Sequence, residues 1–175
     1  MIQLLKKSVF ARVGLCCVLC CVCCGCVGPS DSTLTHRFQQ NQKDFETIVA
    51  MSNEDARLIR IAPTFTRLDD DWSWPRPQAK WGLTPKRWDE YRGLFTKIGL
   101  SGGMYRSQHG KQLFLVAYSS GMMGRGVSLG YAYCGESIPG NPDSLPPCMD
   151  HKESYDGDKY RYQKIAANWY IFEEH

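Results

Sequence analysis

The sequence predicts an α+β domain with two N-terminal helices packed on one face of an antiparallel sheet of about four to six strands. Apolar residues recur at helical spacing in two stretches of the first half of the chain, and at a spacing of two in the second half. The predicted order is helix, strand, helix and then several strands joined by short connections. This order favours helices that lie together on one side of an antiparallel sheet.

The first helix is expected over residues 34–52. Phe38 and Phe45 fall on one face of this helix together with other apolar residues, and Gln, Asn, Lys and Glu lie between them. Residues 57–62 (RLIRIA) follow as a short strand that ends before Pro63. All of residues 34–175 are expected to form this one domain, because a chain of 175 residues suits a single domain.

A long connection follows at residues 63–83 (PTFTRLDDDWSWPRPQAKWGL), which shows no period and is predicted to be an ordered loop. Loops of this length are often functional. Its aromatic and acidic residues combine apolar area with charge, as protein interfaces do. The alternative is that the tryptophans only hold the loop to the core. The candidate partner-binding residues are Asp69, Asp70, Asp71, Trp72 and Trp74.

The second helix has signals at both ends. Thr84 is a good N-cap, Pro85 suits the first helical position, and Gly99 ends the helix. Between them apolar residues such as Trp88 and Tyr91 repeat at helical spacing.

The period of the pattern changes from 3.6 to 2 after the second helix. A turn is expected at His109-Gly110, another at Asn168, and the glycine-rich stretch 119–126 (SSGMMGRG) is expected to be a flexible hairpin connection rather than a phosphate-binding loop. The corresponding strands are expected at residues 103–108, 111–118, 127–134, 160–166 and 168–174.

The net charge of +3 comes from the first dozen residues, which hold Lys6, Lys7 and Arg12 and no acidic residue. Subtracting those three from the 21 basic residues leaves 18, against 18 acidic residues. A body without net charge exerts no long-range attraction on phosphate backbones, so the sequence disfavours nucleic-acid binding.

Residues 1–25 have the pattern of a secretory signal peptide. A basic head is followed by twelve uncharged, apolar residues (VGLCCVLCCVCC, residues 13–24), and the polarity changes at once after Cys26. A spanning helix needs about 20 apolar residues, so this segment is too short for one. Residues 26–33 are then expected to be a lipidated N-terminus and a short tether.

Gly25-Cys26 resembles the cleavage box of bacterial lipoproteins, in which a small residue precedes the cysteine that becomes the new N-terminus. Cys23 and Cys24 stand where such boxes usually carry a leucine and a small residue. The resemblance implies acyl chains on Cys26 that insert into membrane lipid. Val27, which is not Asp, implies sorting to the outer membrane of the bacterial envelope, facing the periplasm.

Three other interpretations of the cysteine-rich stretch remain open. They are multiple palmitoylation of the tail, an ordinary signal peptide cut near Gly25 with Cys26 free, and a metal site. The cysteines are adjacent and lie among Val and Leu, whereas zinc sites use CxxC pairs separated by a polar loop, so the sequence disfavours metal.

Cys134 and Cys148 are the two cysteines that remain beyond Cys26. Disulfides persist in exported proteins, and the two residues bracket a loop rich in Pro and Gly. We therefore expect a disulfide between them, with two buried free thiols as the alternative.

The sequence contains no motif that would hold a metal or a cofactor, and no catalytic residue is assigned. Ser119 and Ser120 precede a glycine but lack the G-x-S-x-G pattern, and the four histidines lack metal spacing. The C-terminal part of the chain is similar to small uncharacterised bacterial lipoproteins that end in a Tyr-rich strand and a Trp-Tyr pair, which implies no activity.

The expected function is that of a membrane-anchored envelope lipoprotein whose small domain binds a protein partner, in an accessory or immunity-like role. The alternative is a hydrolase that acts on cell-wall glycan or peptide, with tryptophans lining the cleft beside two carboxylates.

Overall fold

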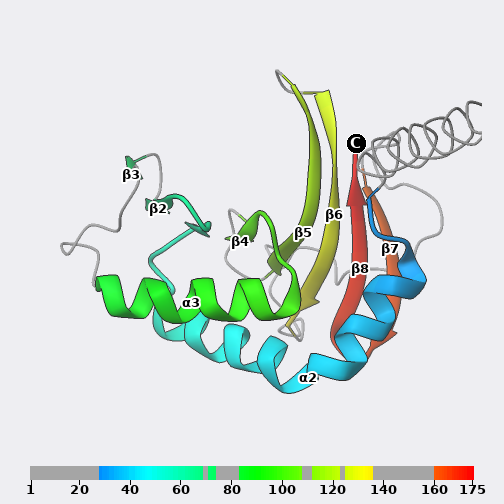
Figure 1. Ribbon diagram of the computed structural model, residues 1–175, viewed down its shortest axis with the longest axis horizontal. Helices are drawn as coiled ribbons and strands as arrows, with labels where there is room; N and C mark the ends of the chain where they lie inside the picture. Colours follow the sequence, from blue (N-terminus) through cyan, green and yellow to red (C-terminus); the bar gives the residue numbers. More distant parts are fainter. Residues whose placement is uncertain (1–27, 69–70, 74–82, 108–111, 123–124, 136–159) are drawn as a thin grey trace, which may run out of the picture.

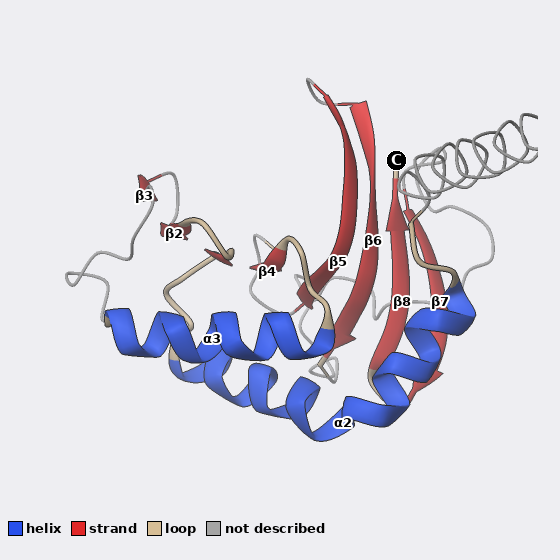
Figure 2. Cartoon of the chain, viewed as in Figure 1, coloured by secondary structure: helices blue, strands red, loops and turns tan. Residues whose placement is uncertain are grey.

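The computed structural model describes residues 28–68, 71–73, 83–107, 112–122, 125–135 and 160–175. Two helices lie along one side of a curved sheet (Figures 1 and 2). The helices are α2 (Asp31–Glu54) and α3 (Pro85–Ile98). The strands are β1 (Arg60–Ile61), β2 (Thr66–Leu68), β3 (Asp71–Ser73), β4 (Gly103–Arg106), β5 (Gln112–Met122), β6 (Arg125–Cys134), β7 (Tyr160–Ala166) and β8 (Trp169–Glu174).

The sheet is antiparallel throughout, with strands in the order β3-β2-β1-β4-β5-β6-β8-β7. The predicted fold class is confirmed, and the sheet has eight strands where about four to six were expected. The two additional strands, β2 and β3, lie in the segment 63–83 that we predicted to be a loop. Each has only three residues, too few to establish a period of two in the sequence.

Helix α2 begins three residues earlier than predicted. Ser30 is its N-cap, and the Ser30 hydroxyl oxygen accepts a hydrogen bond from the Thr33 amide at 3.3 Å. Residues 31–33, which we expected in the tether, therefore belong to the helix. The helix bends at Asn41, whose backbone is not helical (φ −126°, ψ 22°). The Asn41 side-chain amide donates to the Arg37 carbonyl at 2.9 Å, so a side chain replaces part of the backbone ladder at the bend.

Helix α3 confirms its predicted boundaries. The Thr84 hydroxyl oxygen accepts from the Arg87 amide at 3.1 Å, and Pro85 occupies the first turn. Gly99 is left-handed, with φ 70°, and its amide donates to Phe95 and Thr96 carbonyls. A residue with a Cβ would be strained at this φ, which is why a glycine ends the helix.

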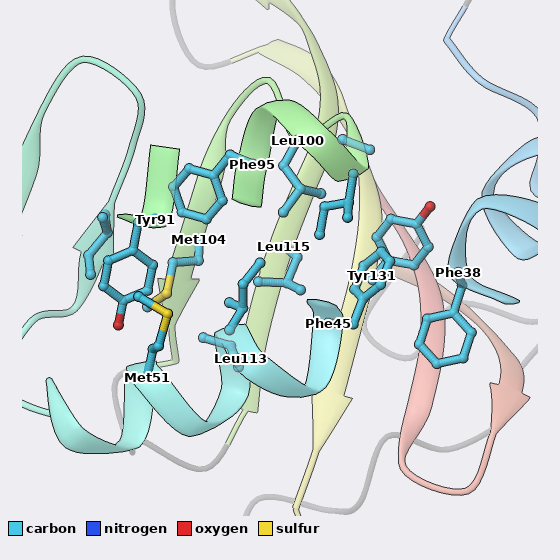
Figure 3. Packing of buried hydrophobic residues seen from close by; sticks show 14 of the residues in the cluster. Phe38, Phe45, Met51, Tyr91, Phe95, Leu100, Met104, Leu113, Leu115 and Tyr131 are labelled. Atoms are coloured by element: carbon cyan, nitrogen blue, oxygen red, sulfur yellow. The ribbon is translucent and has the colours of Figure 1, made fainter. Parts of the chain in front are cut away.

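The main core lies between the helices and the sheet. Figure 3 shows side chains from both helices and from β4, β5 and β6 meeting in this layer. Phe45 makes edge contacts with Tyr131 and Trp169, with ring centroids 4.6 and 5.5 Å apart. Phe38, on the other side of the bend, lies 5.2 Å from Trp169. The bend at Asn41 thus lets both halves of α2 pack against the same two strands, β6 and β8.

The two helices are also joined by polar contacts. The Arg87 guanidinium donates to the Asp55 carboxylate at 2.9 Å, and the Tyr91 hydroxyl donates to the same carboxylate oxygen at 2.9 Å. Lys97 pairs with Asp44 at 2.7 Å. These contacts hold α3 alongside the second half of α2, where both contribute to the core.

The prediction that residues 119–126 form a flexible connection is wrong in large part. Strand β5 continues to Met122 and β6 starts at Arg125, so most of the stretch is a paired hairpin. Gly121 and Gly126 pair with each other, and a Cβ on Gly126 would lie 2.2 Å from the Ser120 carbonyl oxygen. Glycine therefore permits the close approach of the strands. Because glycine has no apolar side chain, these strand ends show no alternation of apolar residues from which they could be predicted.

Candidate functional site

The face of the sheet opposite the helices, called the second face below, carries its own apolar cluster. The six side chains of the cluster are between 0 and 8% exposed. They are Phe114, Val116, Ala132, Cys134, Tyr170 and Phe172, with Tyr105 and Tyr162 packed against them. The sheet thus has side chains buried on both faces.

Strand β6 has only small residues on the second face. Alternation along the strand places Ser128, Gly130, Ala132 and Cys134 there. Large side chains from β5 and β8, on either side, close over this row of small residues. The rings of Phe114 and Phe172 come within 5.2 Å although their strands are two positions apart, which is about 10 Å in a flat sheet. The two aromatic side chains therefore lean toward each other over the small residues of β6.

Tyrosine hydroxyls and a carboxylate meet at the rim of the second face. The Glu174 carboxylate accepts hydrogen bonds from the Tyr160 hydroxyl at 2.9 Å and from the Tyr105 hydroxyl at 3.5 Å. Burial, and next the negative charge of Glu174, raise the pKa of Tyr105 above its ordinary value. Burial raises the pKa of Tyr162 to about 12. The Tyr105 and Tyr162 hydroxyls are therefore protonated near neutral pH and act as hydrogen-bond donors.

Arg60 lies next to this cluster. Its guanidinium sits 5.4 Å from the centre of the Phe65 ring and 5.6 Å from that of Tyr105. Burial lowers the pKa of Arg60. Its Nε atom is buried, and no described residue accepts a hydrogen bond from it. A cation held between aromatic rings, beside hydroxyl donors, suits contact with an anionic group such as a carboxylate of a bound partner.

The predicted partner-binding residues are only partly within the described chain. Asp71 and Trp72 are on β3, the strand at one edge of the sheet, where Trp72 pairs with Arg67 of β2 in the backbone register. Asp69, Asp70 and Trp74 lie outside the described residues, as do Cys26 and Cys148. Cys134 is buried on β6, and its disulfide with Cys148 stays a prediction.

Sequence reasoning missed Arg60, Tyr105 and Glu174. Each sits in a segment that we expected to be a strand, but nothing in those segments shows that the three strands bring their side chains to one face. The available signal was the run of small residues at every second position of β6, from Ser128 to Cys134. Such a run indicates a face on which neighbouring strands supply the bulk.

Several carboxylates of the described chain are held in ion pairs between elements of the fold. Among them are those of Asp31 and Glu173 with Arg161, Asp44 with Lys97, and Asp55 with Arg87. Within the part of the chain that the structure describes, no group of three or more His, Cys, Asp or Glu is arranged to hold a metal ion. Neither of the two described helices combines the length and the apolar character needed to cross a membrane.

Comparison of the chain with protein-family models, with curated proteins and with solved structures found no match.

Proposed function

We propose that the chain is a bacterial envelope lipoprotein, acylated on Cys26, whose α+β domain binds a protein partner in the periplasm. The first part of the proposal rests on the basic and apolar segments before Gly25-Cys26 and on Val27. The second part rests on the position of the candidate partner-binding strand relative to the N-terminus of the domain. The partner-binding role is of the accessory or immunity-like kind.

One observation carries the proposal. The N-terminus of the domain and the candidate partner-binding strand β3 lie at opposite edges of the sheet. Asp31, the first residue of α2, is paired with Arg161 on the edge strand β7 at 2.8 Å. Trp72 is on β3, which is the other edge strand. Seven strand spacings separate the two edges, which is about 34 Å measured along the sheet. An acyl anchor at Cys26 would therefore hold the β7 edge near the membrane and leave the β3 edge accessible from the periplasm.

The second face favours binding over catalysis. Burial raises the pKa values of its Tyr105 and Tyr162 hydroxyls, so these groups serve as hydrogen-bond donors rather than as groups that exchange protons near neutral pH. The hydrolase alternative requires two carboxylates that converge on one bond. Asp31, Asp44, Asp55 and Glu173 are engaged in ion pairs that join elements of the fold.

The anchor is tested by metabolic labelling with a fatty-acid probe. Replacing Cys26 with Ser is expected to abolish labelling and to leave an unprocessed precursor, because no thiol remains at the cleavage position. Unchanged labelling of Cys26→Ser would show that the upstream cysteines carry the acyl groups.

Partner binding is tested by affinity capture of the acylated protein from detergent-solubilised envelopes, followed by identification of the captured proteins. The double variant Trp72→Ala/Trp74→Ala should lose the captured protein with little change in melting temperature. The matched control is Gln163→Ala on the opposite edge strand, where the side chain is exposed and capture should persist. A loss of about 3–5 kcal/mol of stability in the double variant would show instead that these tryptophans are core residues.

A further inference from the structure

The β5–β6 hairpin forms an arm that extends beyond its neighbouring strands. We define the arm as residues 118–122 of β5 and 125–129 of β6. Strand β4 pairs with β5 only over residues 113–116, and β8 pairs with β6 only from Ser128 onward. In the described chain, residues 119–122 and 125–127 therefore pair only with each other. Figure 1 shows the arm projecting past the ends of β4 and β8.

The base of the arm contacts the first described residue of the chain. A Cβ placed on Gly28 would lie 2.7 Å from Leu129 Cδ1 and 2.9 Å from Tyr118 Cδ1, so Gly28 packs directly on these two side chains. Cys26 is two residues before Gly28, a reach of at most about 7 Å. The arm runs about 13 Å further from Leu129 to Arg125. If acyl chains hold Cys26 at a membrane, the arm is within reach of the same surface.

The composition of the arm fits a lipid surface. The chain between Lys111 and Cys134 contains no acidic residue, and its single charged residue is Arg125. The sequence of this stretch also contains Met122 and Met123. The exposed residues of the described arm, such as Ser119, Ser120 and Gly126, are small and lack the large aromatic anchors of protein interfaces. A neutral-to-basic, partly apolar hairpin is compatible with anionic headgroups.

The low intrinsic stability expected of the arm also favours contact with a surface outside the domain. A two-stranded hairpin is marginally stable in water without a sheet or a helix behind it. The tip of the arm has neither among the described residues, and Ser119, Ser120, Gly121 and Gly126 are all exposed. A surface that covers the tip would supply the missing support.

We propose that the arm contacts the lipid surface in which Cys26 is anchored, and that this second contact fixes the orientation of the domain on the membrane. The inference rests on the proposed acylation of Cys26. It adds a specific surface of the protein that touches lipid.

The test uses the full acylated protein in vesicles of phosphatidylethanolamine and phosphatidylglycerol. The variant Ser120→Cys places an exposed thiol on the arm for an environment-sensitive fluorophore, and Lys86→Cys places the same label at the start of α3 as the control. Lipids brominated near the headgroups should quench the label at 120 and leave the label at 86 unchanged, since interfacial segments lie about 5–10 Å deep.

Two charge variants sharpen the test. Val127→Glu should abolish the quenching at 120 on vesicles that contain phosphatidylglycerol, because the new carboxylate is repelled by anionic headgroups. Val127→Lys, a change of similar size and opposite charge, should retain the quenching. Circular dichroism checks that both variants are folded.

The outcomes separate this inference from the proposed function. Mass spectrometry first establishes whether Cys26 is acylated, and a protein without acyl chains would overturn both. Acylated protein that binds vesicles without quenching at 120, or with equal quenching at 120 and 86, would overturn the arm contact alone. So would a response of the label at 120 only to vesicles that hold envelope proteins, which would assign the arm to a protein partner.

Discussion

Arg161 on β7 holds Asp31, the first residue of α2, through two parallel hydrogen bonds. The Nη1–Oδ2 distance is 2.8 Å and the Nη2–Oδ1 distance is 3.1 Å. The Arg161 Nε also donates to Glu173 of β8 at 2.7 Å. The hydrogen bond with Asp31 is the largest contribution to raising the pKa of Arg161. One guanidinium thus connects the start of the first helix to the last two strands.

Replacing Arg161 with Met should lower the free energy of unfolding by about 1–2 kcal/mol, because a paired and hydrogen-bonded guanidinium is lost from two carboxylates. Urea denaturation measures this change, and hydrogen exchange should show faster opening at the first turn of α2. The matched control is Arg92→Met, which removes an exposed pair with Asp89 and should cost less than about 0.5 kcal/mol. Equal losses in the two variants would contradict a special role for Arg161.

Two glycine-to-alanine changes should have opposite effects. A Cβ on Gly130 would lie 2.0 Å from the Leu115 carbonyl oxygen, so strands β5 and β6 would have to separate. We expect Gly130→Ala to lower stability by about 2–3 kcal/mol. Gly93 in α3 has nothing within 4 Å of the corresponding position, and Gly93→Ala should raise stability by up to about 1 kcal/mol. Thermal and urea unfolding of both variants test this, and a stable Gly130→Ala protein would refute the close approach of the strands.

The domain should lose stability in alkaline solution. Burial raises the pKa of Tyr131 to about 12 and that of Tyr162 to about 12, and it also raises those of Tyr91 and Tyr105. An unfolded tyrosine titrates near pH 10, so the neutral form is favoured by folding. The contribution is complete below about pH 10 and is lost as the pH rises toward about 12, at about 1.4 kcal/mol per pH unit for each group. Urea denaturation over this range measures the slope.

Tyr131→Phe is the matched variant for the alkaline experiment. The loss in the free energy of unfolding per pH unit should be smaller in this variant by the contribution of one tyrosine. At neutral pH the variant should be about 1 kcal/mol less stable, because the Tyr131 hydroxyl donates to the Leu34 carbonyl at 3.0 Å in the buried core. An alkaline slope unchanged by this substitution would show that Tyr131 titrates at the same pH in the native and unfolded protein, and that burial does not raise its pKa.

Reduction should destabilise the domain through Cys134. This residue is 6% exposed, and we expect it to form a disulfide with Cys148. Opening the disulfide should cost about 2–4 kcal/mol in the chain-entropy model. Peptide mapping without reductant should recover the two cysteines joined, and Cys148→Ala should be as unstable as the reduced protein. Recovery of both thiols alkylated from folded protein would rule the pairing out.

Helix α3 could be predicted to the residue because its boundaries depend on local chemistry. Thr84, Pro85 and Gly99 each act within one turn, and no distant contact is needed to place them. The prediction of where α2 starts was less accurate, because Ser30 and Asp31 lie in a polar stretch that also suits a tether. The pairing of Asp31 with Arg161, 130 residues away, cannot be inferred from either segment alone.

The strands that sequence reasoning missed are those without an apolar face. The arm is rich in Ser and Gly, and β2 and β3 adjoin a run of aspartates, so these segments show no period of two. The candidate site was missed for a related reason. Arg60, Tyr105 and Glu174 come together through the register of four antiparallel pairings, from β1 to β8, and through the curvature of the sheet.

The row of small residues on β6 constrains how the sequence can change over time. A larger side chain at Ala132 would occupy space that Phe114 and Phe172 fill from the two sides, because these rings meet above the strand. Such a change is tolerated only if one of the two aromatic residues becomes smaller at the same time. In diverging descendants of this chain, position 132 should therefore covary with positions 114 and 172, with the summed side-chain volume preserved.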